Sequence, residues 1–580
     1  MADSNRQLAA LFHRMAAVME ILGGDRFRIN GFERAARTLW ELGEDVSRIG
    51  PDAKAIEKID GIGPGSAKRI AEYLETGRIA EHDELMGRIP PGLLELLDVQ
   101  GLGPKKVAVL WNEAGVEDLD SLKQKLEGDA LADLPGFGRK TIENLRRNVA
   151  FIEQAGQRHR LGDALPLAVW IARELAGAKD VEQAQYAGSL RRGRDTIGDI
   201  DIVVSFKGRD RQPLIEKFKG LEVVAEVLMS GQAKTSIRTG DGMQVDLRIV
   251  EPKQFGAALM YFTGSKEHNV ELRERAQKMG MTLNEYALTR IEDEKVVASK
   301  TEQEIYKALK LAWIPPELRE ARDEIERAAQ DKLPQLIELG DIKADLHTHT
   351  TASDGHWSIE ELAACAAERG FHTVAVTDHS RSQLQANGLS AERLEKHIEA
   401  VRKVAAKLKG TIRVLAGSEV DILGDGELDY PNSLLKELDI VVASPHAALS
   451  QEPKKATDRL IKAIHNPYVS ILGHPTGRLI NRREGLAPDM KKVIAAAAER
   501  GVALELNANG WRLDVRDSHA RLAIESGVKL SINTDAHGPP DLDQLIFGIL
   551  TARRAGATAS DVVNCMSKQA LGQWLASTRR

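Results

Sequence analysis

Alternation of acidic and apolar residues in the segment 199–204, Asp-Ile-Asp-Ile-Val-Val, constrains the fold of this chain more than any other feature. In a β-strand this alternation places the carboxylates of Asp199 and Asp201 on one face, where they can share divalent cations. Asp246 lies in a second strand-like segment and would complete a two-metal site for phosphoryl transfer. An edge strand with an acidic, solvated face is the alternative for the Asp-x-Asp pair taken alone.

A turn rich in glycine and arginine precedes this strand. Residues 188–193 read Gly-Ser-Leu-Arg-Arg-Gly. Their backbone N–H groups, hydroxyl group and guanidinium groups suit a polyphosphate ligand. Together, the turn and the acidic strand favour a metal-dependent nucleotide site over a solvated loop beside an edge strand.

This region resembles the nucleotidyltransferase palm of family X DNA polymerases, the group that includes polymerase beta. The resemblance continues through Tyr-Phe-Thr-Gly-Ser at 261–265 and Met-Thr-Leu-Asn-Glu-Tyr at 281–286. It implies that Asp199, Asp201 and Asp246 hold two Mg²⁺ or Mn²⁺ ions, and that Asp246 helps to activate the primer 3′-hydroxyl. The positions implied to bind the incoming nucleotide are Ser189, Arg192, Gly198, Tyr261, Phe262, Gly264 and Asn269.

The same resemblance implies more specific roles. Tyr261 and Phe262 would line the sugar pocket and exclude a ribose 2′-hydroxyl, Asn269 would approach the base edge, and Arg273 would approach the template strand. One position departs from the family, because its common arginine two residues before the third aspartate is Gln244 here. Control of domain closure through that arginine is therefore not carried over to this chain.

Length and composition indicate a multidomain α/β protein. The chain has 580 residues, enough for about three to five domains. Cys365 and Cys565 are too few for a disulfide framework, and no signal peptide or transmembrane segment is predicted, so we expect a bacterial cytoplasmic protein, associated with the nucleoid when bound to DNA. The net charge of −6 does not favour nucleic-acid binding, but acidic metal sites can mask basic grooves in such a sum.

Three short Gly-x-Gly motifs precede amphipathic helices and resemble helix-hairpin-helix motifs. In such a motif the glycines permit a tight turn, the apolar residue between them enters the core, and N–H groups of the next helix face a DNA phosphate. A plain helix–helix loop is the alternative for one copy, and a dinucleotide site is disfavoured because each turn follows a helical pattern. The residues expected near DNA are Gly61, Gly63, Gly65, Gly101, Gly103, Lys105, Gly136, Gly138 and Lys140.

The helix after the first motif lacks a lysine that polymerase beta uses to form an imine with an abasic-site sugar. Matched through the residues around Gly61 and Gly77, that position is Arg69. A guanidinium group stays protonated and cannot act as an amine nucleophile. Lys68 lies about 100° round the helix from that position. We therefore expect no efficient sugar-phosphate lyase activity.

Beyond Asp341, seven short apolar strands alternate with helical stretches. Regular βα alternation of this kind favours a parallel sheet closed into a barrel. Imidazole and carboxylate groups follow the strand ends, where catalytic groups of barrels converge, and they suit Zn²⁺, Mn²⁺ or Fe²⁺. One such histidine is commonly structural, but nine ligand-type residues on one face favour a metal site. They are His347, His349, Asp354, His379, Glu419, His446, His474, Asp535 and His537.

The order of these residues resembles the polymerase-and-histidinol-phosphatase (PHP) superfamily over 342–580. The resemblance implies up to three divalent metals and hydrolysis of phosphate esters. It implies one metal on His347, His349, Glu419 and Asp535, a second on Glu419, His446 and His474, and a third on Asp354, His379 and His537.

The predicted fold class combines a helical N-terminal region, a mixed-sheet palm with fingers, and a distorted (β/α)7 barrel. The predicted segments are an N-terminal helical DNA-binding domain (1–85), a helical domain with two further hairpins (86–155), the palm (156–252), the fingers (253–316), a charged helical linker (317–341) and the PHP domain (342–580).

These features favour a bacterial-type family X DNA polymerase that fills short gaps in base excision repair, with a metal-dependent 3′–5′ exonuclease or phosphoesterase in the PHP domain. Gapped or nicked DNA and deoxynucleoside triphosphates are the expected partners, with no membrane, and we expect a monomer. The first alternative is a repair nuclease or 3′-phosphatase whose palm only binds DNA. The second is a histidinol-phosphate-type phosphatase fused to an unrelated nucleotidyltransferase. A non-enzymatic scaffold would leave both metal sites unexplained.

Overall fold

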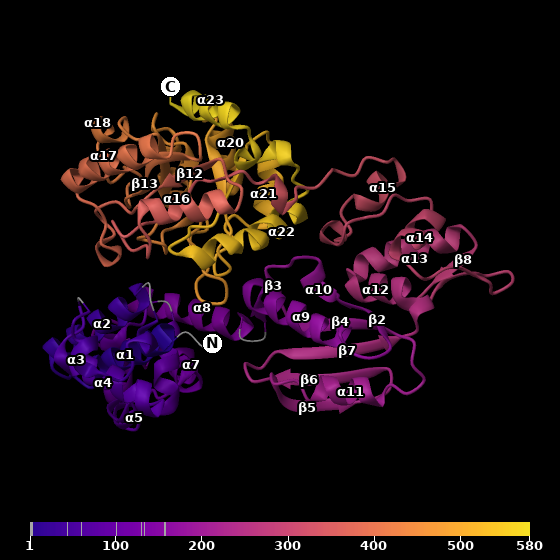
Figure 1. The fold of residues 1–580 in the computed structure, drawn as a ribbon, viewed down its shortest axis with the longest axis horizontal. Helices are drawn as coiled ribbons and strands as arrows, with labels where there is room; N and C mark the ends of the chain where they lie inside the picture. Colours follow the sequence, from indigo (N-terminus) through magenta and orange to yellow (C-terminus); the bar gives the residue numbers. More distant parts are fainter. Residues whose placement is uncertain are drawn as a thin grey trace. The chain divides into compact units, whose positions relative to one another are not determined.

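The computed structural model describes residues 4–42, 45–59, 61–99, 101–128, 130–132, 134–155 and 158–579. Asp60 and Gln100, which open the first two glycine motifs, and Gly156, the first residue of the predicted palm, lie outside the described residues. The chain divides into two compact units, Met1–Gly156 with Asp354–Trp357, and Gln157–Ser353 with Ser358–Arg580. Figure 1 traces their helices and strands in chain order from indigo to yellow.

The first unit is helical. The predicted apolar stripe of its first helix lies in the core, where Leu8, Phe12 and Met15 are fully buried. One hydrophobic core includes side chains from the first helix to the last, so the two N-terminal segments that were predicted separately pack as one body. Its elements are α1 (Ser4–Ile21), α2 (Arg26–Glu41), η1 (Val46–Arg48), α3 (Ala53–Ile56), α4 (Pro64–Thr76), α5 (Ala80–Met86), η2 (Pro91–Asp98), α6 (Pro104–Ala114), α7 (Leu119–Glu127) and α8 (Arg139–Ala155).

The three glycine motifs form tight turns before α4, α6 and α8. Gly61, Gly101 and Gly136 have φ angles of 87°, 95° and 82°, which side chains with a Cβ rarely adopt. At Gly61 a Cβ would also meet Oγ1 of Thr38 at 2.2 Å. The apolar residues between the glycines are buried, as predicted. They are Ile62, Leu102 and Phe137.

The palm of the second unit is a five-stranded mixed sheet with strand order β2-β4-β7-β6-β5. β4 and β7 run parallel, and the other neighbouring pairs are antiparallel. Alternate residues of β4 and β7 pack with α9 and α11 in one core, which leaves the opposite face of both strands for polar side chains. The elements are β1 (His159–Arg160), α9 (Leu161–Ala176), β2 (Val181–Tyr186), α10 (Gly188–Arg191), β3 (Thr196–Ile197), β4 (Asp199–Phe206), α11 (Gln212–Lys219), β5 (Val224–Ser230), β6 (Lys234–Thr239) and β7 (Gln244–Val250).

The segment predicted as fingers has a core of its own and follows the palm through η3 (Pro252–Gln254). A three-stranded antiparallel sheet with strand order β10-β9-β8 stands beside its helices. Its elements are α12 (Phe255–Thr263), α13 (Lys266–Lys278), β8 (Met281–Leu283), β9 (Leu288–Arg290), β10 (Val296–Ala298) and α14 (Glu302–Ala308).

The charged linker differs from the expected continuous helix. After η4 (Pro316–Leu318), the α-helix is limited to α15 (Glu324–Ala329), and Arg319 and Glu324 are buried. Nη1 of Arg319 donates to Glu302 at 2.6 Å, and Glu324 accepts from Nδ1 of His268 at 2.7 Å. Arg319 therefore forms a buried ion pair and Glu324 a buried hydrogen bond with the preceding helices, instead of both lying on a solvated surface.

The C-terminal domain is a parallel seven-stranded barrel, as predicted. A parallel bridge between Thr348 and Ala536, just past the first and last strands, nearly closes it. Its strands are β11 (Ala344–Asp345), β12 (Thr373–Val376), β13 (Arg413–Asp421), β14 (Ile440–Ser444), β15 (Ile471–Leu472), β16 (Ala503–Asn507) and β17 (Leu530–Asn533). Its α-helices are α16 (Ile359–Glu368), α17 (Ala391–Lys407), α18 (Asn432–Leu435), α19 (Pro453–Ile464), α20 (Met490–Arg500), α21 (Asp517–Glu525), α22 (Leu545–Ala555) and α23 (Lys568–Thr578).

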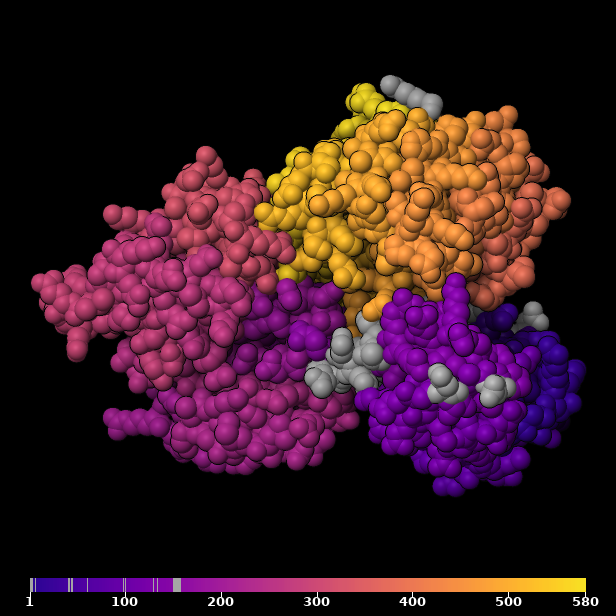
Figure 2. Space-filling model, turned by 180° about the vertical axis from the view of Figure 1, so that it is seen from behind, coloured from indigo at the N-terminus to yellow at the C-terminus, as the bar shows by residue number. Residues whose placement is uncertain are grey.

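Helix α22 of the barrel contacts the segment that follows α14. Nε of Arg553 donates to Oε1 of Glu317 at 2.6 Å, and its Nη1 donates to the carbonyl oxygen of Ile337 at 2.9 Å. In Figure 2 this segment, coloured red, accordingly lies against the yellow part of the barrel. Among the described residues, no helix combines the length and apolarity needed to cross a membrane.

Candidate metal centres

Strands β4 and β7 place the three predicted palm carboxylates on one face of the sheet. Their register pairs Asp201 with Asp246 and Asp199 with Gln244. Asp199 is exposed, Asp201 is half-buried and Asp246 is buried. The period-2 rule therefore produces an acidic face that runs from solvent toward the centre of the sheet.

Two basic side chains lie beside these carboxylates. Nζ of Lys234 lies 2.6 Å from Oδ2 of Asp246, and Nε of Arg248 lies 3.3 Å from Oδ1 of Asp201. Among the described residues, the three carboxylates do not converge as one compact ligand group. Burial, reinforced by the charges of Asp199 and Asp246, raises the pKa of Asp201 to about 6. A carboxylate in such surroundings is one that a divalent cation stabilises.

The glycine–arginine turn approaches the acidic strand closely. Gly188 has a φ of 65°, and a Cβ at this position would lie 3.2 Å from Oδ2 of Asp201. In the sequence, Ser189 follows Gly188 and Gly198 precedes Asp199, and both Ser189 and Gly198 are half-buried. The structure thus brings the predicted triphosphate turn beside the predicted metal-binding aspartates.

The two arginines of the turn have different partners. Arg191 binds both carboxylate oxygens of Glu302 at 2.8 and 2.9 Å, which makes it a bidentate structural contact. Nε of Arg192 donates to Glu320 at 3.0 Å, and its Nη1 donates to the carbonyl oxygen of Thr263 at 2.5 Å. The predicted triphosphate ligand Arg192 is therefore held in a defined orientation. A Cβ at the predicted nucleotide-binding residue Gly264 would meet Nη1 of Arg192 at 3.1 Å.

The predicted sugar-pocket residues lie at the end of α12. The rings of Tyr261 and Phe262 meet edge to face with centroids 5.2 Å apart. The guanidinium carbon of Arg248 lies 3.9 Å from the centroid of Phe262, which links this pair to the acidic face. Nδ2 of Asn269 donates to the carbonyl oxygen of Tyr261 at 2.7 Å, and Arg273 is exposed one turn further along α13.

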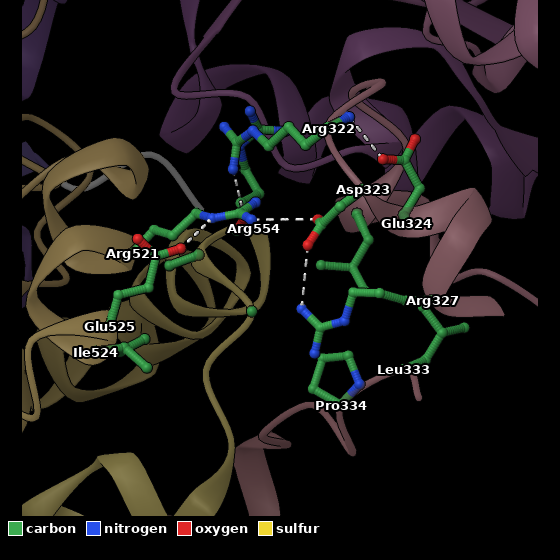
Figure 3. A pocket seen from close by; sticks show the side chains of 13 residues that line it. Arg322, Asp323, Glu324, Arg327, Leu333, Pro334, Arg521, Ile524, Glu525 and Arg554 are labelled. Carbon is green, nitrogen blue, oxygen red and sulfur yellow. Dashed lines mark hydrogen bonds and ion pairs between the residues drawn. The ribbon is translucent and has the colours of Figure 1, made fainter. Parts of the chain in front are cut away.

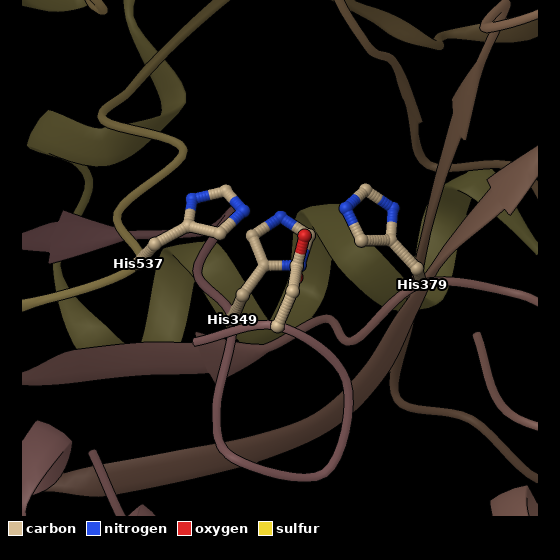
Figure 4. Close-up of side chains that lie close together, drawn as sticks. His349, His379 and His537 are labelled. Atoms are coloured by element: carbon tan, nitrogen blue, oxygen red, sulfur yellow. The ribbon is translucent and has the colours of Figure 1, made fainter. Parts of the chain in front are cut away.

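The barrel brings together eight of the nine predicted C-terminal ligands in three overlapping groups, in each of which the ligand atoms lie within 4.8 Å of one another, and His474 is outside these groups. Figure 4 shows His349, His379 and His537 converging. The first group has the same members as the first predicted ligand set, whereas the others include His349 or His379 in addition to or in place of predicted members. The groups are His347, His349, Glu419 and Asp535; His349, Asp354, His379 and His537; and His379, Glu419 and His446.

Glu419 stands at the centre of these groups. Its Oε1 lies 2.8 Å from Nε2 of His474 and 3.2 Å from Nε2 of His446. Its Oε2 lies 2.8 Å from Nδ1 of His379 and 3.4 Å from Nε2 of His347. Oε2 also lies 3.6 Å from Nε2 of His349, so each carboxylate oxygen faces a different set of imidazoles, which is the geometry that a bridging ligand requires.

Burial opposes the charge of the imidazoles in the barrel site, but nearby carboxylates outweigh it at His347 and His446 and raise their pKa, whereas the pKa of His349 is lowered. Burial and the neighbouring rings of His537 and His379 lower the pKa of His349 to about 4. Burial opposes the charge of Glu419, but the surrounding imidazoles hold its pKa well below the usual value. Neutral imidazole and ionised carboxylate are the donor forms that bind divalent transition metals.

Several buried atoms of this site fit a metal ion. Among the described residues, Nε2 of His347, Oε2 of Glu419 and Nδ1 of His474 are buried without a hydrogen-bond partner. Such atoms normally cost free energy, because buried polar groups are almost always hydrogen-bonded. Coordination to a divalent cation would satisfy those that face the centre, so the residues present fit the metals expected for this barrel.

A second layer of carboxylates holds the ligands, and the sequence did not reveal it. Oε1 of Glu505 accepts from Nδ1 of His347 at 2.7 Å, and its Oε2 accepts from the backbone N–H of His474 at 2.8 Å. Asp421 accepts a hydrogen bond from Nδ1 of His446. Such partners fix the ring orientation of a metal-binding histidine. The one local signal is that Glu505 is a charged residue inside the apolar strand β16.

Some basic residues of the helical unit are exposed, and others form ion pairs within it. Lys105 and Lys140, predicted to lie near DNA, are exposed. Arg69 instead binds Glu81, and its Nη1 donates to the carbonyl oxygen of Gly65 at 2.5 Å. Lys68 is exposed. The position that would carry a lyase nucleophile is thus occupied by a structural ion pair.

A mixed sheet with three carboxylates on one face, Gly-x-Gly hairpin turns and a barrel with clustered metal ligands define a DNA polymerase joined to a metallo-hydrolase barrel. Family comparisons agree with this class. The chain matches the families described as helix-hairpin-helix domain (3–79), SAM-like helix-hairpin-helix tandem (93–148), DNA polymerase beta thumb (258–320) and PHP domain (345–509). The thumb family overlaps the segment that we predicted as fingers.

Comparison with individual proteins extends the match to the whole chain. The chain is 37% identical to the DNA polymerase/3′-5′ exonuclease PolX of Bacillus subtilis over 97% of both chains. It is 26% identical to rat DNA polymerase lambda over 51% of this chain and 53% of the relative. A probable phosphatase of Thermoanaerobacter is 32% identical over 38% of this chain and 89% of the relative. The chain therefore belongs to the family X DNA polymerases that carry a C-terminal PHP domain.

Proposed function

We propose that this protein fills short gaps in DNA during base excision repair and removes nucleotides from 3′ ends with its PHP domain. The observation that carries the proposal is the register of β4 and β7, which sets Asp201 beside Asp246 on the face that also bears Asp199. Its similarity to PolX along the whole chain supports the pairing of both activities in one protein.

In the palm, Asp199, Asp201 and Asp246 would hold two Mg²⁺ or Mn²⁺ ions. When bound, these ions neutralise charge that develops on the transferring phosphoryl group. Burial raises the pKa of Asp246, but hydrogen bonds from Lys234 and neighbouring groups outweigh it and lower the pKa, so this carboxylate is ionised at neutral pH and can accept the proton of the primer 3′-hydroxyl.

Other palm residues bind and select the nucleotide. Ser189 and Arg192, with the backbone of Gly198, would bind the triphosphate through charge-assisted hydrogen bonds. Tyr261 and Phe262 would form the wall that meets a ribose 2′-hydroxyl and rejects it by shape.

In the barrel, the three ligand groups around Glu419 would hold up to three divalent ions, with Mn²⁺, Zn²⁺ and Fe²⁺ as candidates. When bound, these ions supply the charge that stabilises a phosphate ester during hydrolysis. The protein's own contribution is orientation, because Glu505 fixes the ring of His347 and Asp421 fixes that of His446. The similarity to probable phosphatases makes removal of a 3′-phosphate a second candidate reaction for the same site.

The helix-hairpin-helix turns would bind gapped or nicked DNA through phosphates. Exposed Lys105 and Lys140 stand at the starts of α6 and α8, where backbone N–H groups are unpaired within the helix. Such contacts read no base sequence, so we expect DNA affinity to fall steeply with salt and to vary little with sequence.

One assay tests both activities. Gapped DNA with a labelled 3′ end is incubated with each candidate divalent metal, with and without deoxynucleoside triphosphates. We expect the labelled strand to lengthen when nucleotides are present and to shorten without them. A preparation that only removes a 3′-phosphate would favour the second candidate, and one that never extends the strand would refute the polymerase assignment.

A further inference from the structure

A buried arginine of the barrel contacts the nucleotide-binding turn of the palm. Arg554 lies near the end of α22, and its side chain is 3% exposed. Its Nη1 donates to the backbone carbonyl oxygen of Arg192 at 2.8 Å and to Oε1 of Glu320 at 2.8 Å. Its Nη2 donates to Asp517 at 2.9 Å. One guanidinium group thus joins the barrel, the palm turn and the segment after the thumb.

Glu320 is the carboxylate that this arginine holds in place. It lies 3.0 Å from Nε of Arg192 and 3.4 Å from Nη1 of Arg194, in addition to its bond with Arg554. Burial raises the pKa of Glu320, but the charges of Arg554 and Arg192 outweigh that effect and lower it. The carboxylate is therefore ionised and fixed among three guanidinium groups.

The orientation of Arg192 follows from these contacts. Glu320 fixes its Nε edge, and the carbonyl oxygen of Thr263 fixes Nη1. Charge-assisted hydrogen bonds of this kind impose direction as well as energy. The guanidinium plane of Arg192 therefore depends on Glu320, and the position of Glu320 depends on Arg554.

Arg554 is itself held from the opposite side. Figure 3 shows it at the wall of a cavity of about 230 Å³, with Arg322, Arg521 and Asp323 around it. Arg322 donates to the backbone carbonyl oxygen of Arg554 at 3.3 Å and to Asp517 at 3.2 Å. The charged residues after the thumb therefore clamp the end of α22, which limits the freedom of the Arg554 guanidinium.

We propose that Arg554 is a positioning residue of the polymerase site: through Glu320 and the backbone of Arg192, the barrel holds the Arg192 guanidinium in the orientation that meets the nucleotide triphosphate. The proposal rests on the proposed function, which assigns Arg192 to the triphosphate. Small displacements of a group that orients substrate can cost large factors in binding or rate. The PHP domain would then serve nucleotide binding in a way that is independent of its metal centre.

The test measures single-nucleotide gap filling by the full-length protein as a function of deoxynucleoside triphosphate concentration. In R554M we expect the KM for the nucleotide to rise about 10-fold and kcat to change less than about threefold, because ground-state binding of the triphosphate is what the network supports. Hydrolysis of a labelled 3′ end and the metal content of the barrel should match the wild type. R554K, which retains one charged donor group, should restore part of the affinity.

R553M is the matched control. Arg553 precedes Arg554 on the same helix, but it bonds to Glu317 and the carbonyl oxygen of Ile337. Within the described residues it makes no hydrogen bond or ion pair with Arg192 or Glu320. We expect the nucleotide KM of R553M to stay within about twofold of the wild type. An equal rise of KM in both variants would show that domain packing, not positioning of Arg192, is responsible, and would overturn the inference.

E320Q shows whether Glu320 supports or opposes nucleotide binding by Arg192. It also tests the inference if R554M does not fold. Positioning predicts a higher nucleotide KM in E320Q, because an amide holds Arg192 less firmly. A lower KM would show that Glu320 competes with the triphosphate for Arg192, and would overturn the inference. R192M separates this from the proposed function: an unchanged KM in R192M refutes the role of Arg192, whereas a raised KM in R192M with a normal KM in R554M and E320Q refutes the positioning role alone.

Discussion

In the palm, three carboxylates stand on two paired strands at a partly exposed face, and the protein's own cations, Lys234 and Arg248, lie against two of them. In the barrel, eight of the nine predicted ligand residues form three overlapping groups near the ends of parallel strands, and a second layer that includes Glu505 and Asp421 fixes the rings. In the palm, the negative charges of two carboxylates are therefore already balanced by basic side chains without a metal. In the barrel, buried metal-ligand atoms have no hydrogen-bond partner among the described residues.

The two centres should therefore differ in how tightly they hold metal ions. A palm ion must displace Lys234 from Asp246 and Arg248 from Asp201, so its binding gains less free energy and it should exchange readily with solution. A barrel ion meets buried donors that are already oriented, and its release would leave them unsatisfied. We expect the barrel metals to remain through purification and the palm ions to be supplied with the substrate.

The largest effect should come from removing a palm ligand. In D201A we expect nucleotide addition to fall by roughly 10³-fold or more, because a shared ligand of a two-metal site is lost. Hydrolysis at the barrel should remain within about twofold of wild type, since the two centres share no ligand. Parallel extension and degradation assays on one preparation measure both activities, and an equal loss of both in a folded variant would show that the two metal centres are not independent.

Removing Glu419, the central carboxylate of the barrel, tests the other metal centre. In E419A we expect hydrolysis to fall by about 10²- to 10³-fold and gap filling to persist, because each oxygen of Glu419 faces a different set of imidazoles. Elemental analysis should show the loss of more than one ion per chain. Full metal content in E419A would mean that this residue does not bridge.

A substitution in the second layer should have an intermediate effect. E505Q keeps the shape of the side chain but removes the charge that accepts from Nδ1 of His347. We expect metal affinity at that position to fall by about 10- to 100-fold, the usual cost of an outer-shell change. Competition with a fluorescent chelator measures this directly. Affinity equal to that of the wild type would show that the backbone alone orients His347.

The smallest effect concerns the metal-free palm. The pKa of Asp201 is raised to about 6 from 3.8, so the folded protein binds its proton more tightly than the unfolded chain does. The stability this contributes is present below about pH 4 and is lost as the pH rises through about 6. With chelator at pH 8, D201N should therefore be more stable than the wild type, by at most about 3 kcal/mol.

Melting curves at pH 4 and pH 8 show whether D201N is more or less stable than the wild type. Asp199→Asn is the control, because Asp199 is exposed on the same strand and its substitution should matter less. Adding Mg²⁺ at pH 8 should stabilise the wild type more than D201N. A D201N variant that is less stable than the wild type at pH 8 would show that Arg248 outweighs the repulsion among the carboxylates.

Periodicity in the sequence was enough to predict the acidic face and the barrel. Asp201 and Asp246 both lie on the face opposite the core residues of their strands, as period-2 alternation predicts, and the short βα repeats give the number of barrel strands. Glu505 could not be assigned, because its partner His347 is 158 residues away and no local pattern links the two. The pairing of Arg554 with Glu320, 234 residues apart, was hidden for the same reason.

Charge alternation after the thumb was misleading for a different reason. A stretch of alternating signs is typical of a solvated helix. Here Arg319 is buried in an ion pair with Glu302, and Glu324 is buried in a hydrogen bond with His268, so the same pattern encodes contacts between elements. A sequence shows which charges exist, but the partner of each charge is decided by tertiary packing.

The bridge between Thr348 and Ala536 has a consequence for the order in which the protein becomes functional during synthesis. The first ligand group includes His349 and Asp535, which lie 186 residues apart in the sequence. A ribosome-bound chain that has not yet reached residue 535 therefore cannot form that metal centre. The palm sheet is complete with β7, which ends at Val250. Because domains fold as they emerge, the nucleotidyltransferase sheet can form while the hydrolase still lacks its final strand. A chain cut short before residue 535 would carry the sheet that adds nucleotides without the complete centre that removes them.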